Sequence, residues 1–146
     1  MAGGFERRPP LGFWAVVVLL TVWNAIGCWF CYMQFKLGAD AMPGATDYDR
    51  ALLAAMPGWY NWVYALAVGA GAIGGLVLLA RSRVAKPLFV VSLAALVLQF
   101  GYLFATTDII AHKGAATVVP FPILIALIAA FAIWFANRAI LRGWAR

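Results

Sequence analysis

Charged residues are scarce in this chain: Asp, Glu, Lys and Arg make up 11% of its 146 residues, whereas 66% of the residues are hydrophobic. A soluble domain has about a quarter charged residues, and a domain this small cannot bury so much apolar surface away from water. Four windows contain no charge at all: 9–35, 51–80, 87–107 and 114–137. Each is long enough for the roughly 20 apolar residues with which a helix spans a bilayer. The composition therefore excludes an ordinary soluble domain and indicates a membrane protein.

Residues that carry chemistry are equally scarce. The chain has one His, two Cys and five acidic residues, and the sequence contains no Ser-His-Asp set, carboxylate pair or metal-binding cluster. No charged residue falls inside a predicted span, whereas ion-coupled pumps usually need one there. We therefore expect a protein that is not an enzyme, with no catalytic residues, no resident metal and no cofactor.

The four windows predict an all-α fold, an antiparallel bundle of four transmembrane helices in a single membrane domain over residues 1–146. Continuous apolar runs argue against alternating barrel strands. The first run is about twice the usual length of a signal-peptide core, roughly 7–15 residues, so we expect it to be retained. The helices are expected near 12–35, 59–80, 87–106 and 119–137, with outer loops at 36–58 and 107–118.

The longer outer loop contains Thr46 followed three residues later by Asp49, a weak form of the capping box that begins helices. Apolar residues follow it, and Pro57-Gly58 ends the segment. A short amphipathic helix is therefore predicted at the outer surface.

Lys and Arg are distributed unequally between the two sides of the predicted bundle. The two ends of the chain and the loop between the second and third helices carry eight of them, including Arg7, whereas the other side carries three. Positively charged loops stay in the cytoplasm, which places both termini there. Anionic lipid headgroups are the expected partners of Arg81, Arg83 and Lys86. No soluble face presents a basic patch, so we expect no nucleic acid partner.

Residues 69–74 form a literal G-x-G-x-x-G, the signature of dinucleotide-binding loops. That signature requires a strand before it and an acidic residue about 20 positions later, and neither is present here. Small residues spaced by four instead allow two helix backbones to approach closely in lipid. We therefore predict a helix-packing face, whose partner is in the same chain or in another copy, made of Ala67, Gly71, Gly74 and Gly75.

Two polar stripes run along the first and third predicted helices. The first contains Thr21 and Asn24, and the second contains Ser92, Gln99, Tyr102 and Thr106. From the helical rise, Asn24 and Gln99 lie at similar depth, roughly 18–20 Å from the inner helix ends. One interpretation is an Asn24–Gln99 amide pair that clamps two helices; the other is a polar lining for a solute path.

Cys28 and Cys31 form a C-x-x-C within the first helix. Four-helix membrane oxidoreductases that use quinone also carry such a pair, but they need a second pair that this chain lacks. We interpret the two cysteines as packing residues and keep them as a candidate thiol pair. A copper site formed by Cys28, Cys31, Met33 and His112 is a further alternative.

Several short motifs in 22–35 and 57–104 resemble a family of small four-span inner-membrane proteins of gram-negative bacteria, often labelled "sugar transporter". The resemblance implies a bacterial inner-membrane location. An acidic residue often follows the first-helix glycine in that family, whereas apolar Phe30 stands near that position here, which disfavours proton coupling. The motifs are Trp23-Asn24-Ala25 with Gly27, Pro57 with Trp59, Gly71 with Gly74-Gly75, Leu78-Leu79, Arg81-Ser82-Arg83, Ala85 with Pro87, and Phe89 with Ser92-Leu93.

These patterns favour a non-catalytic membrane protein that acts by helix–helix association, as an accessory subunit or scaffold of a larger complex or as a homo-oligomer. Its partners would then be membrane lipids and other membrane protein subunits. A small-solute, sugar-like transporter that works as an oligomer is the first alternative. Membrane thiol or quinone redox chemistry is the second.

Overall fold

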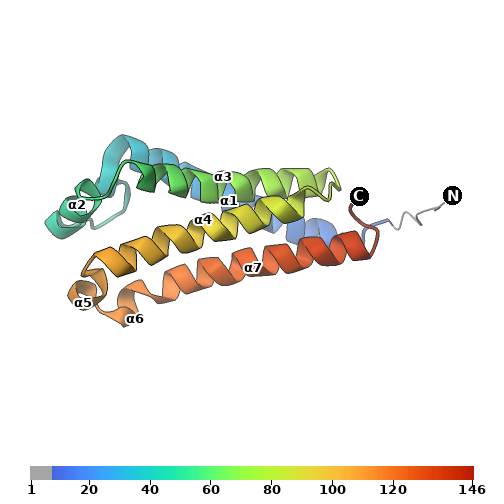
Figure 1. Ribbon diagram of the computed structural model, residues 1–146. Helices are drawn as coiled ribbons and strands as arrows, with labels where there is room; N and C mark the ends of the chain where they lie inside the picture. The colour runs from blue at the N-terminus through green and yellow to red at the C-terminus, as the bar shows by residue number, and fades with distance from the viewer. Residues whose placement is uncertain (1–7) are drawn as a thin grey trace.

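The computed structural model describes residues 8–146, and within that range the chain is helical with no β-strand (Figure 1). This confirms the predicted all-helical class with four long apolar helices. The elements are α1 (Leu11–Leu37), the 3₁₀ turn η1 (Gly38–Ala41), α2 (Asp47–Ala54), α3 (Trp59–Leu79), α4 (Ala85–Thr106), α5 (Ile109–Lys113), α6 (Ala115–Val118) and α7 (Pro120–Leu141).

The four long helices are apolar and long enough to cross a membrane. Their limits differ from the predicted ones by at most four residues. The largest difference is at α7, which continues to Leu141 instead of ending near 137. α4 begins at Ala85, two residues before Pro87. Pro87 is tolerated there because the N–H that proline lacks would have no intrahelical partner in the first turn. The expected loop 107–118 instead contains the two short helices α5 and α6.

The short helix predicted after Thr46 is present as α2. Thr46 accepts a hydrogen bond from the backbone N–H of Asp49, and the Asp49 carboxylate accepts one from the backbone of Thr46, which completes the capping box of α2. Arg7, one of the eight cations in the charge count, lies outside the described residues.

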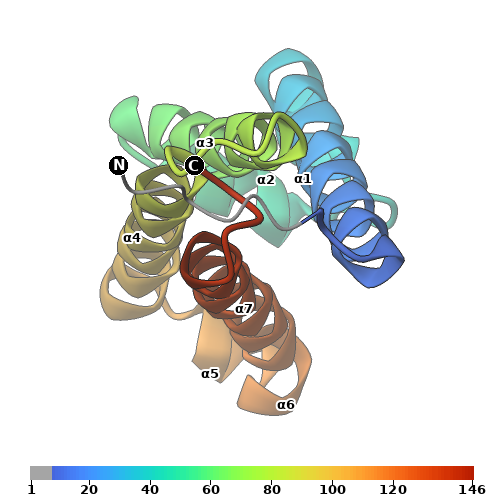
Figure 2. The same ribbon diagram turned by 90° about the vertical axis from the view of Figure 1, so that its right-hand side faces the viewer.

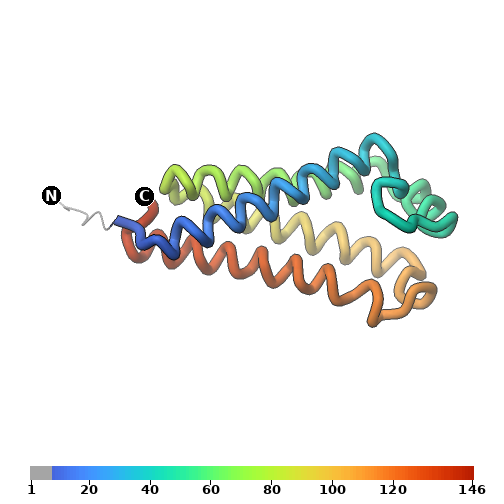
Figure 3. Tube along the Cα trace, turned by 180° about the vertical axis from the view of Figure 1, so that it is seen from behind, coloured from blue at the N-terminus to red at the C-terminus, as the bar shows by residue number. Residues whose placement is uncertain are grey.

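Contacts between neighbours place the long helices in the order α1, α3, α4, α7. Consecutive long helices run in opposite directions, so that α1 begins and α7 ends at the same end of the molecule, which we call the termini end (Figure 1). η1, α2 and α5 lie at the opposite end; we call these three elements the cap. α1 and α7 lie nearest to each other at the termini end and diverge toward the cap (Figures 2 and 3).

Glycines in α3 set its close approach to α1. A Cβ atom on Gly71 would lie 2.0 Å from Oδ1 of Asn24, and one on Gly75 would lie 2.4 Å from Oγ1 of Thr21 and 3.1 Å from its Cα. A side chain at Gly75 would meet the backbone of Thr21 and force the helices apart, whereas one at Gly71 would displace the Asn24 side chain. The polar stripe of α1 is accommodated because α3 presents no side chain opposite it.

The other face of α3 packs on α4. A Cβ atom on Gly74 would lie 2.7 Å from the ring of Phe89, and the Ser92 hydroxyl donates a 2.6 Å hydrogen bond to the carbonyl of Ala67. The four small residues of the predicted packing face thus contact two helices of the same chain: Gly71 and Gly75 face α1, whereas Gly74 and Ala67 face α4.

The main apolar core lies at the termini end. Phe13 of α1 stacks on Phe135 of α7 with a ring-centroid distance of 5.8 Å, and both are buried. The chain end closes this core, because Arg146 exchanges two backbone hydrogen bonds of 2.7 Å with Arg81 and Arg83. Other buried members of the core are Val17, Leu20, Leu78, Ala85, Phe89, Ala132, Ala136, Ala139 and Ala145.

We predict that Gly75→Ala destabilises the protein by about 1–3 kcal/mol, because its Cβ would overlap the side chain and the backbone of Thr21. Thermal unfolding in a mild detergent, followed by circular dichroism, measures the effect. The control is Gly69→Ala in the same helix, where nothing lies within 4 Å of the added Cβ. That variant should unfold at the wild-type temperature or above it, since Ala favours helix over Gly. Equal unfolding temperatures for the two variants would contradict the close approach.

Candidate functional site: a cavity between the long helices

A cavity of about 470 Å³ lies between the four long helices, within the range of small-molecule sites. Its walls are mostly apolar. α1 contributes Leu20, Trp23, Asn24, Ile26, Gly27, Phe30 and Gln34; α3 contributes Tyr60, Tyr64, Ala67, Val68 and Gly71; α4 contributes Phe89, Ser92, Leu96, Gln99 and Phe100; and α7 contributes Phe121, Ile125, Ile128, Ala129 and Ala132.

The cavity follows from two features of the packing. Small residues of α3 and α7 line it, namely Ala67, Gly71, Ala129 and Ala132, and they leave space that larger side chains would fill. In addition, α1 and α7 diverge beyond the Phe13–Phe135 contact, so no close helix–helix contact closes that side (Figures 2 and 3).

The cavity is open where residues of its wall are exposed. Three of these residues lie on α1 and α7: Ile26 (49%), Phe30 (41%) and Phe121 (56%). We call the opening between them the mouth; it faces the apolar outer surface of the long helices. Met42, which follows η1, lines the cavity at the cap and is itself 56% exposed, so the cap covers that end only in part.

Four of the polar side chains that line the cavity come from α1 and α4. Asn24 Nδ2 donates to the carbonyl of Leu20 at 2.9 Å, and the hydroxyl of Ser92 is bound to Ala67. Gln34 Nε2 donates to Oδ1 of Asn61 at 2.7 Å. Gln99 is the exception, because it is 95% buried and its Oε1 has no hydrogen-bond partner.

The expected Asn24–Gln99 clamp is wrong. Asn24 satisfies its amide N–H within its own helix, and Gln99 keeps an unpaired oxygen. In a helix, a short polar side chain reaches its own i−4 carbonyl more easily than a group across the bundle. Both residues nevertheless line the same cavity, as the alternative interpretation required.

Tyr102 and the cysteines lie outside the cavity wall. Tyr102 packs edge-on against Trp59 at 4.7 Å, near the start of α3. Cys31 is buried, and Cys28 donates a weak hydrogen bond to the carbonyl of Val68 at 3.5 Å; both are free thiols. The proposed copper set is not assembled, because no three His, Cys, Asp or Glu residues gather within residues 8–146. His112 instead stacks on Tyr48 in the cap, with ring centroids 3.7 Å apart.

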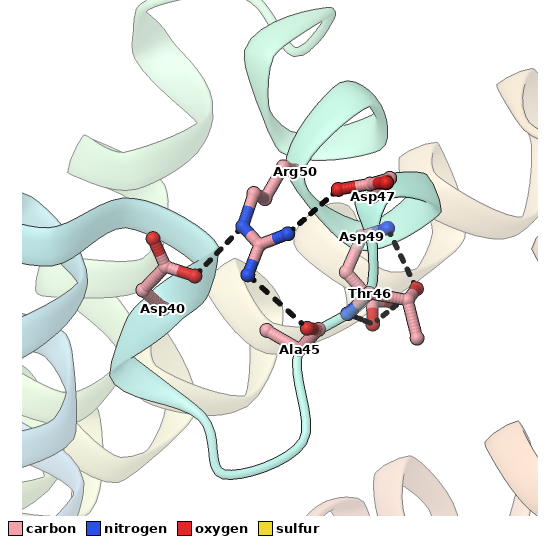
Figure 4. Close-up of polar contacts among 6 residues, drawn as sticks. All are labelled: Asp40, Ala45, Thr46, Asp47, Asp49 and Arg50. Carbon is pink, nitrogen blue, oxygen red and sulfur yellow. Dashed lines mark hydrogen bonds and ion pairs between the residues drawn. The ribbon is translucent and has the colours of Figure 1, made fainter.

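Ion pairs hold the cap together. Nε of Arg50 contacts Oδ1 of Asp40 and its Nη1 contacts Oδ1 of Asp47, both at 2.8 Å (Figure 4). The Asp40 contact joins α2 to η1 across Met42. The third contact of this guanidinium is the carbonyl of Ala45.

The cap also joins α2 to the segment around α5, far along the chain. Lys113 pairs with Asp49, and Tyr48 donates a 2.6 Å hydrogen bond to Asp108. This bond, burial and nearby negative charge raise the pKa of Tyr48 to about 12. The hydrogen bond from Lys113 and the backbone bond from Thr46 lower the pKa of Asp49. No local sequence pattern predicts this junction, since its partners are about 60 residues apart along the chain.

The predicted headgroup residues lie at the termini end and partly contact protein groups. Arg81, at φ 61°, donates from Nε to the carbonyl of Trp144 at 2.7 Å, and Lys86 donates to Oδ1 of Asn137 at 3.0 Å. Arg83 is exposed. Arg81 thus fastens the C-terminal turn to the loop before α4, and Lys86 fastens α7 to the first turn of α4.

Comparison with known proteins returned no matching family, no matching curated protein and no matching solved structure.

We predict that the cap loosens at both extremes of pH. The lowered pKa of Asp49 means that its contribution is present above the usual value of 3.8 and is lost as pH falls through the folded-state pKa. The raised pKa of Tyr48 has the opposite sign: its contribution is present below 10 and is lost as pH rises through about 12. Hydrogen exchange of the α2 amides, corrected for intrinsic rates, reports both transitions.

A matched pair of variants isolates the acid-side contact at neutral pH. Asp49→Asn retains an oxygen for the capping box but loses the charge that pairs with Lys113, so α2 should exchange several-fold faster. Asp47→Asn removes a carboxylate that is fully exposed, and exposed pairs contribute little. Wild-type protection in Asp49→Asn would refute the role of this ion pair.

Proposed function

We propose that this is an integral inner-membrane protein with four spans and both termini in the cytoplasm. The four apolar helices support the spans, and the charges support the orientation. Two of the three cations at the cap, Arg50 and Lys113, are paired with carboxylates there, which reduces the positive charge of that end further. The termini end carries Arg8, Arg81, Arg83, Lys86, Arg138, Arg142 and Arg146.

Two tags test this orientation in intact cells. A fluorescent reporter that folds only in the cytoplasm, fused after Arg146, should be fluorescent. An epitope inserted after Pro43, in the exposed turn before α2, should be cleaved by protease added to spheroplasts. Cleavage of the C-terminal reporter together with protection of the epitope would show the opposite orientation.

We further propose that the protein is non-catalytic and binds a small, membrane-soluble molecule. The cavity of about 470 Å³ with its mouth between α1 and α7 carries this proposal. Its apolar walls favour an apolar ligand, because burying polar groups without partners costs free energy. Its mouth faces the surface that lipid would cover, so the ligand would reach it from the bilayer.

The solute-carrier alternative has weaker support. A sugar needs many hydrogen-bond partners, yet the amide N–H of Asn24 and the hydroxyl of Ser92 are already bound to backbone carbonyls. The family resemblance and its sugar-transport label remain predictions. Redox chemistry has no support beyond the two thiols themselves.

Accessory-subunit function is the second candidate, and the low burial of α1 and α7 favours it. Only 11% of the most apolar α7 window is buried within the chain, compared with 33% for α3. The glycine face does not supply the contact surface, since α1 and α4 occupy it. Association would therefore use the outward faces of α1 and α7.

Filling the cavity tests the ligand-binding proposal. We expect the wild-type protein, purified in mild detergent, to retain an extractable small molecule that native mass spectrometry detects as added mass. Ala129→Trp places a large side chain in the cavity wall and should abolish the added mass. Ala130→Trp adds the same side chain at an exposed position and should retain it.

The same spectra distinguish the candidates. A bare 15.8 kDa chain in wild type, even after incubation with membrane lipid extract, would contradict the ligand-binding proposal. A second polypeptide or a multiple of the chain mass would support association, and a lone chain would count against it.

A further inference from the structure

The Gln99 side chain carries an unsatisfied hydrogen-bond acceptor in the wall of the cavity. The residue is only 5% exposed, and its Oε1 is the one buried side-chain polar atom without a partner among residues 8–146. Leaving such an atom unpaired is unfavourable, and buried polar groups are rarely left so. An unpaired acceptor beside an empty space therefore points to a donor that comes from outside the chain.

Two polar groups of the wall are already committed. Asn24 donates to Leu20, and Ser92 donates to Ala67. The Tyr60 hydroxyl interacts with the Gln99 side chain, and Oε1 stays unpaired. An O–H or N–H group of a ligand would supply the missing donor.

The rest of the wall restricts what else the ligand can carry. Within residues 8–146, the lining contains no Asp, Glu, Lys, Arg or His, so a charged headgroup would have no counter-ion. Leu96, Phe100, Ile125 and Ile128 surround the remaining space with apolar surface. A neutral hydroxyl on an apolar chain satisfies both constraints.

The size and the mouth of the cavity determine how the hydrocarbon chain of the ligand would lie. At about 30 Å³ per water-sized group, the cavity holds roughly 15 such groups, which is a hydroxyl and about a dozen carbons. A longer chain would leave through the mouth between Ile26 and Phe121, toward the surface that lipid would cover.

We propose that the ligand is a membrane-soluble alcohol with a single hydroxyl headgroup, whose O–H donates to Oε1 of Gln99 while its chain lies between α1 and α7. This inference rests on the proposed ligand-binding function and specifies its ligand class.

The test compares 11-bromo-1-undecanol with its methyl ether, which differs in lacking the donor. Bromine quenches tryptophan fluorescence on contact, and Trp23 lines the cavity. The part of the quenching that is lost in Trp23→Phe reports the cavity alone. In detergent-solubilised wild type, we expect the alcohol to bind about tenfold more tightly than the ether, the ratio expected for one hydrogen bond to an otherwise unpaired buried group.

Two variants on α4 assign that preference to one atom. Gln99→Met keeps the length of the side chain but removes the acceptor, so the alcohol-to-ether ratio should fall below about twofold. Thr106→Val is the matched control, since Thr106 is on the same helix, lies outside the cavity wall and donates to the carbonyl of Tyr102. This control should retain the tenfold ratio.

Stability supplies an independent measurement. Removing an unpaired polar group should raise the unfolding temperature of ligand-free Gln99→Met above that of wild type. A lower temperature would assign Gln99 a structural role and overturn the inference. Equal binding of alcohol and ether by wild type would also overturn it while leaving the ligand-binding function intact. Quenching of Trp23 by neither probe would instead remove the ligand-binding function itself.

Discussion

The close approach of α1 to α3 at Gly71 and Gly75 is the constraint on which the rest of the structure depends. Because Thr21 and Asn24 occupy the space that side chains on α3 would fill, the axis of α1 is fixed beside α3 along the middle of both helices. α4 is held to the opposite face of α3 through Gly74 and Ser92. α7 packs on α4 and reaches α1 at the termini end, so the cavity forms where this last side is left open.

Polar groups in the long helices are satisfied locally where the side chain is short enough. Thr21 donates to Val17 and Asn24 to Leu20, each one helical turn earlier, whereas Ser92 donates to a carbonyl of the neighbouring helix. In an apolar environment these bonds matter because no water replaces them. Gln99 departs from this pattern, because its Oε1 is unpaired beside the cavity. The polar stripe of α4 therefore bears on the proposed ligand binding, whereas that of α1 bears on the packing against α3.

The sequence was sufficient to predict what depends on local pattern. Charge-free windows located the four long helices, and Thr46 with Asp49 located α2, since both signals lie within a few turns of the chain. Small residues in α3 indicated close packing but not the partner, because spacing cannot distinguish α1 from another copy. The cavity could be anticipated only from its polar members, Asn24, Ser92 and Gln99. The α7 wall and the contacts of α2 with the α5 segment depend on tertiary packing. The pattern of apolar residues within one helix does not show which other helix it will contact.

The cap pairs cations with carboxylates and also forms one end of the cavity wall. Cap carboxylates pair with Arg50 and Lys113. The Arg50–Asp40 pair joins α2 to η1 across Met42, which lines the cavity from that end. The cap covers that end of the cavity in part, since Met42 itself is 56% exposed, and the core of Phe13 and Phe135 fills the bundle at the other end. The mouth past Ile26 and Phe121 opens sideways onto the apolar surface of α1 and α7. In the proposed function, a ligand that enters there comes from the medium around the helices, so this path favours lipid-soluble ligands before any polar contact is made.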